Sequence, residues 1–364
     1  MLLSSIISII ESVAPLAYQE SYDNSGLVVG DRNMEISGIT VCLDVTLEVI
    51  DEAVRRKANL IVSHHPVIFN PLKKLTENTL TEKILISAVR NNIALYSAHT
   101  NLDNVVKGVN QVICDILGLT RTKILTPREN LLKKLVTFVP RSHADSVRKA
   151  LFDAGAGHIG NYDSCSFSSE GKGTFRAGED SSPYVGEIGE LHVEDELRIE
   201  TIFPFHLKPR IVRALLEAHP YEEVAYDIVP VENSFDQTGS GMVGELDQPM
   251  EERAFLNKIK TVFNCKILRH SRLLNQSLSK VAVCGGSGSF LIKDAITAGA
   301  QLFLTGEIKY HQFFEAEDKI VIADIGHFES EQFTIQLIYD ILIKNLPNFA
   351  IHFSSINTSP IYYL

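Results

Sequence analysis

Three strand-like stretches of this sequence end in a histidine, and two of the histidines have a carboxylate four residues further on. The six side chains are His64 and His65 after residues 60–63, His99 and Asp103 after residues 92–98, and His327 and Glu331 after residues 319–326. The first turn of a helix after a strand would bring the carboxylate back beside the histidine. Imidazole and carboxylate together are typical ligands of zinc, iron, manganese or cobalt, so the pattern indicates metal chemistry.

The adjacent pair His64 and His65 needs a turn in the chain. Neighbouring residues of a strand face opposite ways, so both rings can serve one site only where the backbone bends. Pro66 marks such a bend, because proline cannot continue a central strand. Two histidines that merely cap a strand are the alternative, since a pair without partners is a weak metal signal. The two similar strand ends elsewhere favour the metal site.

The number of ligands predicts two metal ions. Three or four imidazoles and two carboxylates exceed the four ligands of one tetrahedral zinc ion. Two ions that share a bridging carboxylate or hydroxide would use all of them. We therefore expect two divalent ions per chain. Zinc is the metal that we expect, and iron, manganese and cobalt are also compatible with the ligands.

Alternating strands and helices predict the layer that positions these ligands. A strand at 38–44 and a helix at 46–57 lead into the strand that carries the two histidines, and a final helix follows Glu331. This alternation is typical of an α/β layer with a mostly parallel sheet. Ligands of such sheets bind outside the carboxyl ends of the strands, where the histidines lie.

A second group of polar residues follows two later strands. Residues 280–284 form a predicted strand that leads into Gly285–Ser289 and a helix at 290–298. The glycine-rich turn could cradle a phosphate or be only a tight turn. Glu307 and His311 follow the strand at 301–304 and again lie four residues apart. They could act as catalytic acid or base beside the metals, or be exposed residues of a helix start.

The middle of the chain has a different order of elements. From residue 134 we expect strand, helix, strand, strand, helix and strand, at 135–139, 144–154, 163–167, 197–203, 209–218 and 224–229. This is the β-α-β-β-α-β order of a ferredoxin-like unit. Residues 168–189 are expected to be an exposed connection and 232–241 a polar linker. The predicted domains are 1–126 with 236–364, and an insert at 127–235.

The charge, the cysteines and the apolar runs of the sequence disfavour several classes of protein. There are 34 basic and 45 acidic residues, a net charge of -11, with no basic tract, which disfavours binding to nucleic acid or anionic membranes. Five scattered cysteines without a CxxC pair predict neither a disulfide framework nor a structural zinc knuckle, as expected of a cytoplasmic protein. No apolar run approaches the length of a membrane span.

The assembled motifs resemble the Nif-three-like family, whose bacterial members carry the label "GTP cyclohydrolase I type 2 homolog". The matching stretches are Tyr-Asp-Asn-Ser-Gly-Leu at 22–27, Ser-His-His-Pro at 63–66, His-Thr-Asn-Leu-Asp at 99–103, Gly-Gly-Ser-Gly at 285–288, Thr-Gly-Glu-Ile-Lys-Tyr-His at 305–311 and Gly-His-Phe-Glu-Ser-Glu at 326–331. Two stretches of the insert, at 157–163 and 219–223, are also similar. Tyr22 stands where the family usually has tryptophan.

The resemblance implies a fold, a ligand set and an assembly. It implies a three-layer α/β fold with an inserted domain similar to the PII and CutA proteins, and a ring-shaped homohexamer. The metal ligands that it carries over are His64, His65, Asp103, His327 and Glu331, with Glu331 as the bridge and His99 not a usual ligand.

Two functions are compatible with these expectations. The first is a metal-dependent hydrolase, in which a metal-bridging hydroxide attacks a nucleotide such as GTP and Glu307 or His311 transfers protons. The second is a non-catalytic metal-binding scaffold, with the insert as a sensor or docking module. An open coordination position would favour the enzyme, because a catalytic site keeps one for water.

Overall fold

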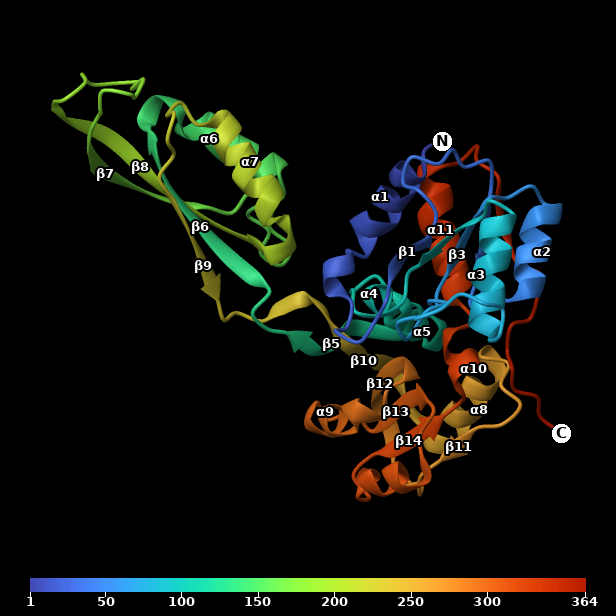
Figure 1. Ribbon diagram of the computed structural model, residues 1–364. Coiled ribbons are helices and arrows are strands. Elements are labelled where there is room, and N and C mark those ends of the chain that lie inside the picture. Colours follow the sequence, from blue (N-terminus) through green and yellow to red (C-terminus); the bar gives the residue numbers. More distant parts are fainter. The chain divides into compact units, whose positions relative to one another are not determined.

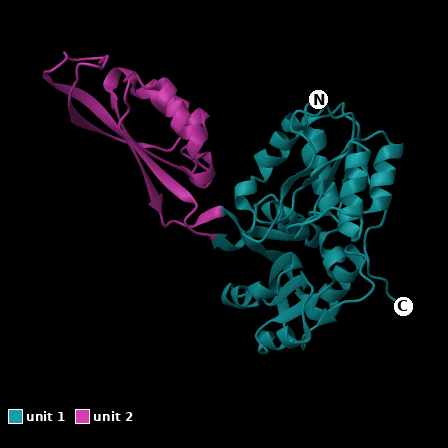
Figure 2. Cartoon of the chain, viewed as in Figure 1, with its two compact units in different colours: residues 1–127, 237–364 teal, residues 128–236 magenta.

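The computed structural model describes residues 1–364 and divides into two compact units, which Figure 2 draws in different colours. Unit 1 comprises Met1–Pro127 and Gln237–Leu364, and unit 2 comprises Arg128–Asp236. Each boundary lies one residue after the boundary predicted from the sequence. The chain is a mixed α/β protein with three sheets, and no helix has both the length and the apolar character that crossing a membrane requires.

The first half of unit 1 is built on a five-stranded sheet in the order β1-β4-β3-β2-β15. Its strands are β1 (Gly26–Val29), β2 (Ile39–Cys42), β3 (Leu60–Ser63), β4 (Ala94–Ser97) and β15 (Ile351–Phe353). All neighbours are parallel except β1, which pairs antiparallel with β4 at the edge. Every residue of β2, β3 and β4 is buried, as expected for parallel strands that are covered on both faces.

Helices cover both faces of this sheet (Figure 1). They are α1 (Leu3–Val13), α2 (Leu47–Arg55), α3 (Leu80–Arg90) and α11 (Thr334–Asn345). The apolar faces of α2 and α3 pack together on Ile61 and Leu95 of the strands, while α1 and α11 lie on the opposite side (Figure 1). The side chain of Thr46 caps α2 by accepting a hydrogen bond from the Val49 amide, so the predicted helix begins at its cap.

The second half of unit 1 contains a six-stranded sheet in the order β11-β14-β13-β12-β10-β5. Its strands are β5 (Leu119–Arg128), β10 (Phe235–Glu251), β11 (Arg269–His270), β12 (Ser277–Ser287), β13 (Leu302–Gly306) and β14 (Val321–Asp324). Strands β12, β13 and β14 are parallel, whereas β10 and β11 run antiparallel to their neighbours β12 and β14. The helices of this half are α4 (Thr100–Asp103), α5 (Val109–Leu117), α8 (Glu252–Val262), α9 (Ile292–Thr297) and α10 (His327–Glu331).

Unit 2 is a four-stranded antiparallel sheet in the order β7-β8-β6-β9. Its elements are β6 (Leu132–Pro140), α6 (Ala144–Asp153), β7 (Phe167–Arg176), β8 (Leu191–Pro204), α7 (Lys208–Ala218) and β9 (Tyr226–Val231). Both helices lie on the same face of the sheet (Figure 1). There Val147, Leu151, Ile211 and Leu215 form a core with strand residues such as Ile199.

Two connections predicted from the sequence are in fact strands. Residues 167–176 form β7, although the strand was expected at 163–167 and an exposed connection from 168 onward. This segment is polar and contains glycine, but ten of its residues pair with β8, so that it forms an edge strand of the sheet. Similarly, most of the predicted linker at 232–241 belongs to the long strand β10. Pairing with neighbouring strands overrides the weak local preference of such polar residues.

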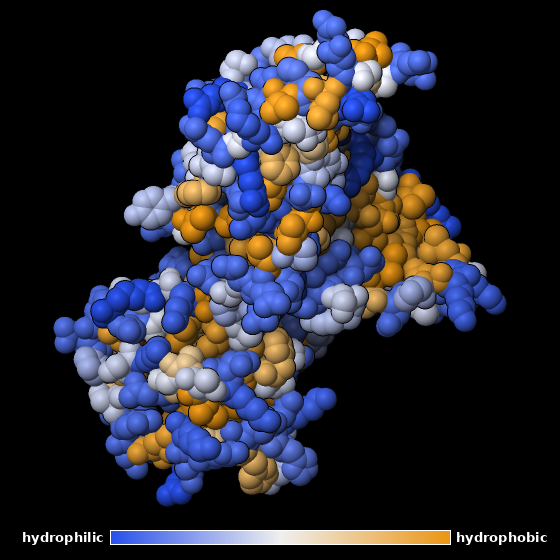
Figure 3. All heavy atoms as spheres, turned by 90° about the vertical axis from the view of Figure 1, so that its left-hand side faces the viewer, coloured by the Kyte–Doolittle hydropathy of each residue, from blue (hydrophilic) through white to orange (hydrophobic).

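Short 3-10 helices complete the fold, and one of them changes a predicted element. They span Leu16–Tyr18, Arg141–His143, Phe205–Leu207, Ser289–Leu291 and Tyr310–Ala316. The helix expected at 290–298 is therefore a 3-10 turn followed by only six α-helical residues, Ile292–Thr297. The face of the molecule drawn in Figure 3 carries many polar side chains, with apolar side chains gathered in separate patches.

Candidate metal centre

The carboxyl ends of β3 and β4 place three of the predicted histidines side by side. The rings of His64 and His65 lie 4.9 Å apart, and His99 lies 5.3 and 5.4 Å from them. His64 is fully buried and its Nδ1 atom lies 2.8 Å from the Ala98 carbonyl oxygen. A carbonyl can only accept, so this Nδ1 carries the proton and the lone pair is on Nε2.

A first group of ligand atoms consists of His65, His327 and Glu331. The Nε2 atoms of the two histidines lie 3.1 Å apart, and each is 3.0 Å from Oε2 of Glu331. Zinc bonds of 2.0–2.2 Å in a tetrahedron keep ligand atoms roughly 3.3 Å apart. The three atoms are thus already close to the spacing that one such ion needs.

A second group consists of His64, Asp103 and Glu331. Nε2 of His64 lies 3.6 Å from Oδ1 of Asp103 and 3.7 Å from Oε1 of Glu331. Both the His64 nitrogen and the Asp103 oxygen are buried and have no hydrogen-bond partner. Unsatisfied buried polar atoms are rare and costly. An ion among them would satisfy both, so these residues fit a metal.

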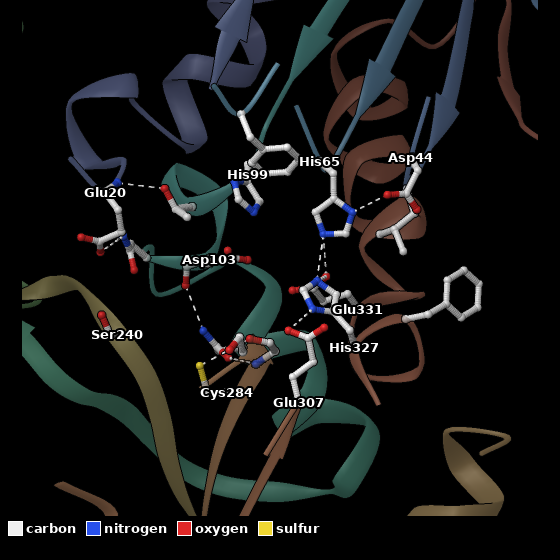
Figure 4. A pocket seen from close by; sticks show the side chains of 18 of the residues that line it. Glu20, Asp44, His65, His99, Asp103, Ser240, Cys284, Glu307, His327 and Glu331 are labelled. Carbon is white, nitrogen blue, oxygen red and sulfur yellow. Dashed lines mark hydrogen bonds and ion pairs between the residues drawn. The ribbon is translucent and has the colours of Figure 1, made fainter. Parts of the chain in front are cut away.

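Glu331 belongs to both groups through different oxygens. Its Oε2 faces His65 and His327, and its Oε1 faces His64. Figure 4 shows the side chains of Glu331 and His327 directly opposite His65. Glu331 is only 3% exposed. Glu331 therefore contributes one carboxylate oxygen to each group of candidate ligand atoms.

The charges of the cluster are strongly coupled. Burial and the nearby Glu331 carboxylate raise the pKa of Asp103 well above its usual value. Burial opposes ionisation of Glu331 as well, but the attraction of His64 and hydrogen bonds with the histidines hold the pKa of Glu331 well below its usual value. Although burial lowers the pKa of a histidine, hydrogen bonds with Asp44 and Glu331 raise the pKa of His65 to about 10. Protons on the histidines thus balance the carboxylate charge that metal ions could balance instead.

Further carboxylates orient two of the candidate ligands. Nδ1 of His65 lies 2.8 Å from Oδ1 of Asp44, whose Oδ2 accepts a hydrogen bond from Thr358. Nδ1 of His327 lies 3.3 Å from Oε2 of Glu307. Such partners fix the ring and direct Nε2 at a metal. Asp44 was not among the residues predicted from the sequence, although its place at the end of the strand expected at 38–44 was a signal.

His99 is held by the carboxylate of Asp23, which belongs to the motif at 22–27. Its Nδ1 lies 2.7 Å from Oδ1 of Asp23, and Oδ2 of Asp23 accepts hydrogen bonds from Ser25 and Thr100. Burial opposes ionisation of Asp23, but these hydrogen bonds outweigh it and lower the pKa of the carboxyl group. The ligand atoms of His64, His65 and His99 also lie within 4.8 Å of one another. The turn at 22–27 therefore supplies a hydrogen-bond partner to a histidine of the site.

A cavity of about 440 Å³ opens beside the cluster. The polar and charged groups of its wall include Glu20, Asp44, His65, His99, Asp103, Asn104, Asn110, Ser287, Glu307, His327 and Glu331, and its aromatic groups are Tyr22, Phe69, Phe290 and Phe328. The C-terminal segment adds Ser359, Pro360 and Ile361. No lysine or arginine lines the cavity.

The structure brings Glu307 to this cavity but not His311. Glu307 has a φ of 58°, which breaks the chain direction after β13, and the next element is the 3-10 helix Tyr310–Ala316. No α-helical turn therefore returns residue 311 to the side of residue 307. His311 is exposed and lies against the ring of Phe314. The expectation that both residues flank the metals is corrected to Glu307 alone.

The glycine-rich segment supports Glu331 instead of forming a free anion cradle. The amides of Gly285, Gly286 and Gly288 donate hydrogen bonds to Asn110, Ser330 and Thr305, respectively. A Cβ atom on Gly286, which has a φ of +62°, would lie 2.3 Å from Oε1 of Glu331. Of the two interpretations left open by the sequence, the structure favours the tight turn, which gives the carboxylate room.

Comparison with known proteins shows the family of this chain. Residues 1–360 match the family model described as Duf34/NIF3 (NGG1p interacting factor 3). The chain belongs to the Duf34/NIF3 family. This confirms the resemblance found in the motifs. Two curated relatives named "GTP cyclohydrolase 1 type 2 homolog" come from Halalkalibacterium halodurans and Bacillus subtilis; they are 40% and 39% identical over 325 residues, which are 89% of this chain and 87% of each relative.

Solved structures of Duf34/NIF3 proteins have the same fold. A Bacillus cereus protein related to NIF3 is 39% identical and matches with a TM-score of 0.87 over 100% of this chain and 99% of its own. A Staphylococcus aureus protein is 29% identical and matches with a TM-score of 0.78 over 100% of this chain and 99% of its own. The mixed α/β architecture is thus that of NIF3-related structures.

Proposed function

We propose that this Duf34/NIF3 protein is a metal-dependent hydrolase with a dinuclear centre, which acts on a nucleotide. The observation that carries the proposal is the position of Glu331, whose two oxygens face two separate groups of ligand atoms at the wall of a cavity. A carboxylate shared by two ions a few ångströms apart is a recurring arrangement of dinuclear hydrolases.

The ligands divide between two ions. His65 and His327 would hold the first ion, His64 and Asp103 the second, and Glu331 both. Zinc suits this donor set, as do iron, manganese and cobalt. Each ion would have three protein ligands, which leaves at least one position for water or substrate, as catalytic zinc sites do.

Two divalent ions held by these ligands would polarise a substrate bond and lower the pKa of a bound water molecule. The protein's own residues then handle the proton. His99 lines the cavity and its Nδ1 is held by Asp23, so its Nε2 is the atom available to accept or donate a proton. In this proposal His99 takes the role that was predicted for His311, and Glu307 orients His327.

A nucleotide is the substrate class that we propose. The relatives from Halalkalibacterium halodurans and Bacillus subtilis are named after GTP cyclohydrolase. The cavity of about 440 Å³ is within the usual range of small-molecule sites, and Tyr22 and Phe69 of its wall can contact a base. Because the wall has no lysine or arginine and the glycine amides are occupied, the negative charge of the phosphates would have to be balanced by the ions.

Metal content and turnover on one sample test the proposal. Purified protein should contain about two metal ions per chain and release product from GTP or another nucleotide of a panel, and chelator should abolish this release. His311→Gln should behave as the native protein, because His311 lies outside the cavity. Two ions without turnover of any nucleotide would contradict the hydrolase and favour the non-catalytic scaffold. One ion per chain or fewer would contradict the dinuclear centre.

Two further expectations belong to the proposal. We propose a ring-shaped homohexamer, for which sedimentation should give a mass near six times 40.5 kDa. We also propose that unit 2 is a ferredoxin-like insert of the PII and CutA type. Its strand order β7-β8-β6-β9 and its two helices on one face support the ferredoxin-like part of this assignment.

A further inference from the structure

Unit 2 contains a second cavity, which the proposed hydrolase does not use. It measures about 580 Å³, in the range of small-molecule sites. The wall is formed by β6, β7 and β8, by the loop after β7 and by the turn after α7. Its side chains include Phe138, Lys172, Phe175, Tyr184, Glu196, Arg198, Tyr221 and Glu222.

The central polar group of this cavity is Glu196. Glu196 is 8% exposed, and its Oε1 accepts a hydrogen bond of 2.8 Å from the hydroxyl of Tyr221. No lysine, arginine or histidine lies in ion-pair contact with it. The carboxylate fits here only because residue 173 is glycine, since a Cβ atom there would lie 2.2 Å from Oε2 of Glu196. A nearly buried carboxylate without a cation is costly.

The two bases of the wall are already paired with other acids. Nη2 of Arg198 lies 2.9 Å from Glu200, and Nζ of Lys172 lies 3.2 Å from Asp195. Both side chains are about half exposed or more. The wall therefore offers an uncompensated negative charge at its buried end. An anion would have to displace these ion pairs, whereas a cation would not.

Aromatic rings line the same cavity as the carboxylate. The rings of Phe175 and Tyr221 lie 6.0 Å apart and those of Tyr184 and Tyr221 6.3 Å apart, and Phe138 also lines the cavity. The faces of aromatic rings attract ammonium groups, and several rings together are a recurring way to bind quaternary ammonium ligands.

We propose that this cavity binds a small organic ammonium ion, with Glu196 balancing its charge and Phe175, Tyr184 and Tyr221 packing against its apolar part. The site lies wholly within unit 2 and does not rest on the metal centre. It would give the insert the role of a small-molecule sensor.

Choline and its uncharged analogue 3,3-dimethylbutan-1-ol test the proposal on the full chain. The two probes have the same shape and differ in charge, so calorimetric titration should give binding of choline at least tenfold tighter than of the alcohol. n-Butylamine and succinate serve as a primary amine and an anion. Tighter binding of either ammonium probe than of the alcohol and succinate supports the site; no binding, or equal or tighter binding of the alcohol or succinate, overturns it.

Glu196→Gln is the decisive variant. Glutamine keeps the size of the side chain and can still accept the Tyr221 hydrogen bond, so the fold should persist while ammonium binding weakens at least tenfold. Glu170→Gln is the matched control, because Glu170 lines the same cavity but is exposed and paired with Arg141. Equal binding by the native protein and Glu196→Gln would overturn the assignment. A change of oligomeric state in Glu196→Gln, without loss of binding, would make the cavity part of a contact between copies and would also overturn it.

Discussion

Nε2 of His64 and Oδ1 of Asp103 face each other across 3.6 Å, and neither atom makes a hydrogen bond although both are buried. Burial and the nearby Glu331 carboxylate raise the pKa of Asp103, and burial lowers the pKa of His64, so the pair is not stabilised as an ordinary ion pair. The arrangement is the one expected of two ligands on either side of an ion, and it leads to the first prediction.

Asp103→Asn should remove one of two metal ions. The second ligand group loses one of its two carboxylates, while His65, His327 and Glu331 keep the first group complete. Elemental analysis should fall from about two ions per chain to about one. Asp115→Asn is the control. Asp115 is exposed on α5, and its side chain accepts a hydrogen bond from Gln111, which is not part of the cluster. Retention of two ions by Asp103→Asn would contradict the division of ligands.

Metal affinity should rise with pH between about 7 and 9. Burial lowers the pKa of a histidine, but hydrogen bonds with carboxylates outweigh it and raise the pKa of His65 to about 10 and that of His327 to about 9 in the metal-free protein. A raised pKa means that both rings hold an extra proton at pH 7, and this proton must leave before Nε2 can bind a metal. Each displaced proton changes the affinity roughly tenfold per pH unit. Zinc titrations in two buffers of different ionisation enthalpy should report release of about two protons, and affinity that is constant from pH 7 to 8 would contradict this.

His99→Gln should lower turnover while leaving metal content unchanged. Its Nδ1 is held by Asp23 and its Nε2 is the atom that we assign to proton transfer. Loss of a general base typically costs about 10²- to 10⁴-fold in rate. The expected signature is a fall in kcat with little change in KM and two ions retained. If metal is lost instead, His99 is a metal ligand. The ion would then be held by the group that His99 forms with His64 and His65.

Glu52→Gln should destabilise unit 1, most clearly near neutral pH. Glu52 is 3% exposed and accepts hydrogen bonds from Ser354 and Ser355, which anchor the C-terminal segment that reaches the metal cavity. Burial opposes ionisation of Glu52, but these hydrogen bonds outweigh it and lower the pKa of the carboxyl group. A lowered pKa gives stability that is present above the unfolded value of about 4.5 and is lost as pH falls through the folded value. Hydrogen bonds to a charged group contribute about 1.5–3 kcal/mol.

Thermal unfolding at pH 7 and pH 4 checks this prediction. The native protein should lose stability on going to pH 4, and the difference between it and Glu52→Gln should shrink. Asp51→Asn is the control, since Asp51 lies on the same helix and its side chain is exposed. A difference in Tm that is the same at both pH values would assign the effect to packing instead of charge.

The ligand set and the alternation of strands and helices could be predicted from the amino-acid sequence alone. Apolar runs that end in histidine mark the carboxyl ends of buried strands, and these ends meet at one edge of a parallel sheet whatever the rest of the fold does. Residue types and spacing were for this reason enough to single out His64, His65, His99, Asp103, His327 and Glu331 as candidates, whereas the set of five ligands without His99 came from the family resemblance. The spacing of four brings Glu331 beside His327 on α10, whereas Asp103 of α4 faces His64.

The contacts between side chains of the candidate sites depend on the tertiary structure. The same spacing was misleading for Glu307 and His311, because a left-handed residue and a 3-10 helix replace the expected turn. The pairing of polar segments such as β7 depends on a partner strand that local preference does not reveal. The division of ligands by the two oxygens of Glu331, and the buried carboxylate of Glu196 among aromatic rings, arise from contacts between residues far apart in the chain, so only the tertiary structure could establish them.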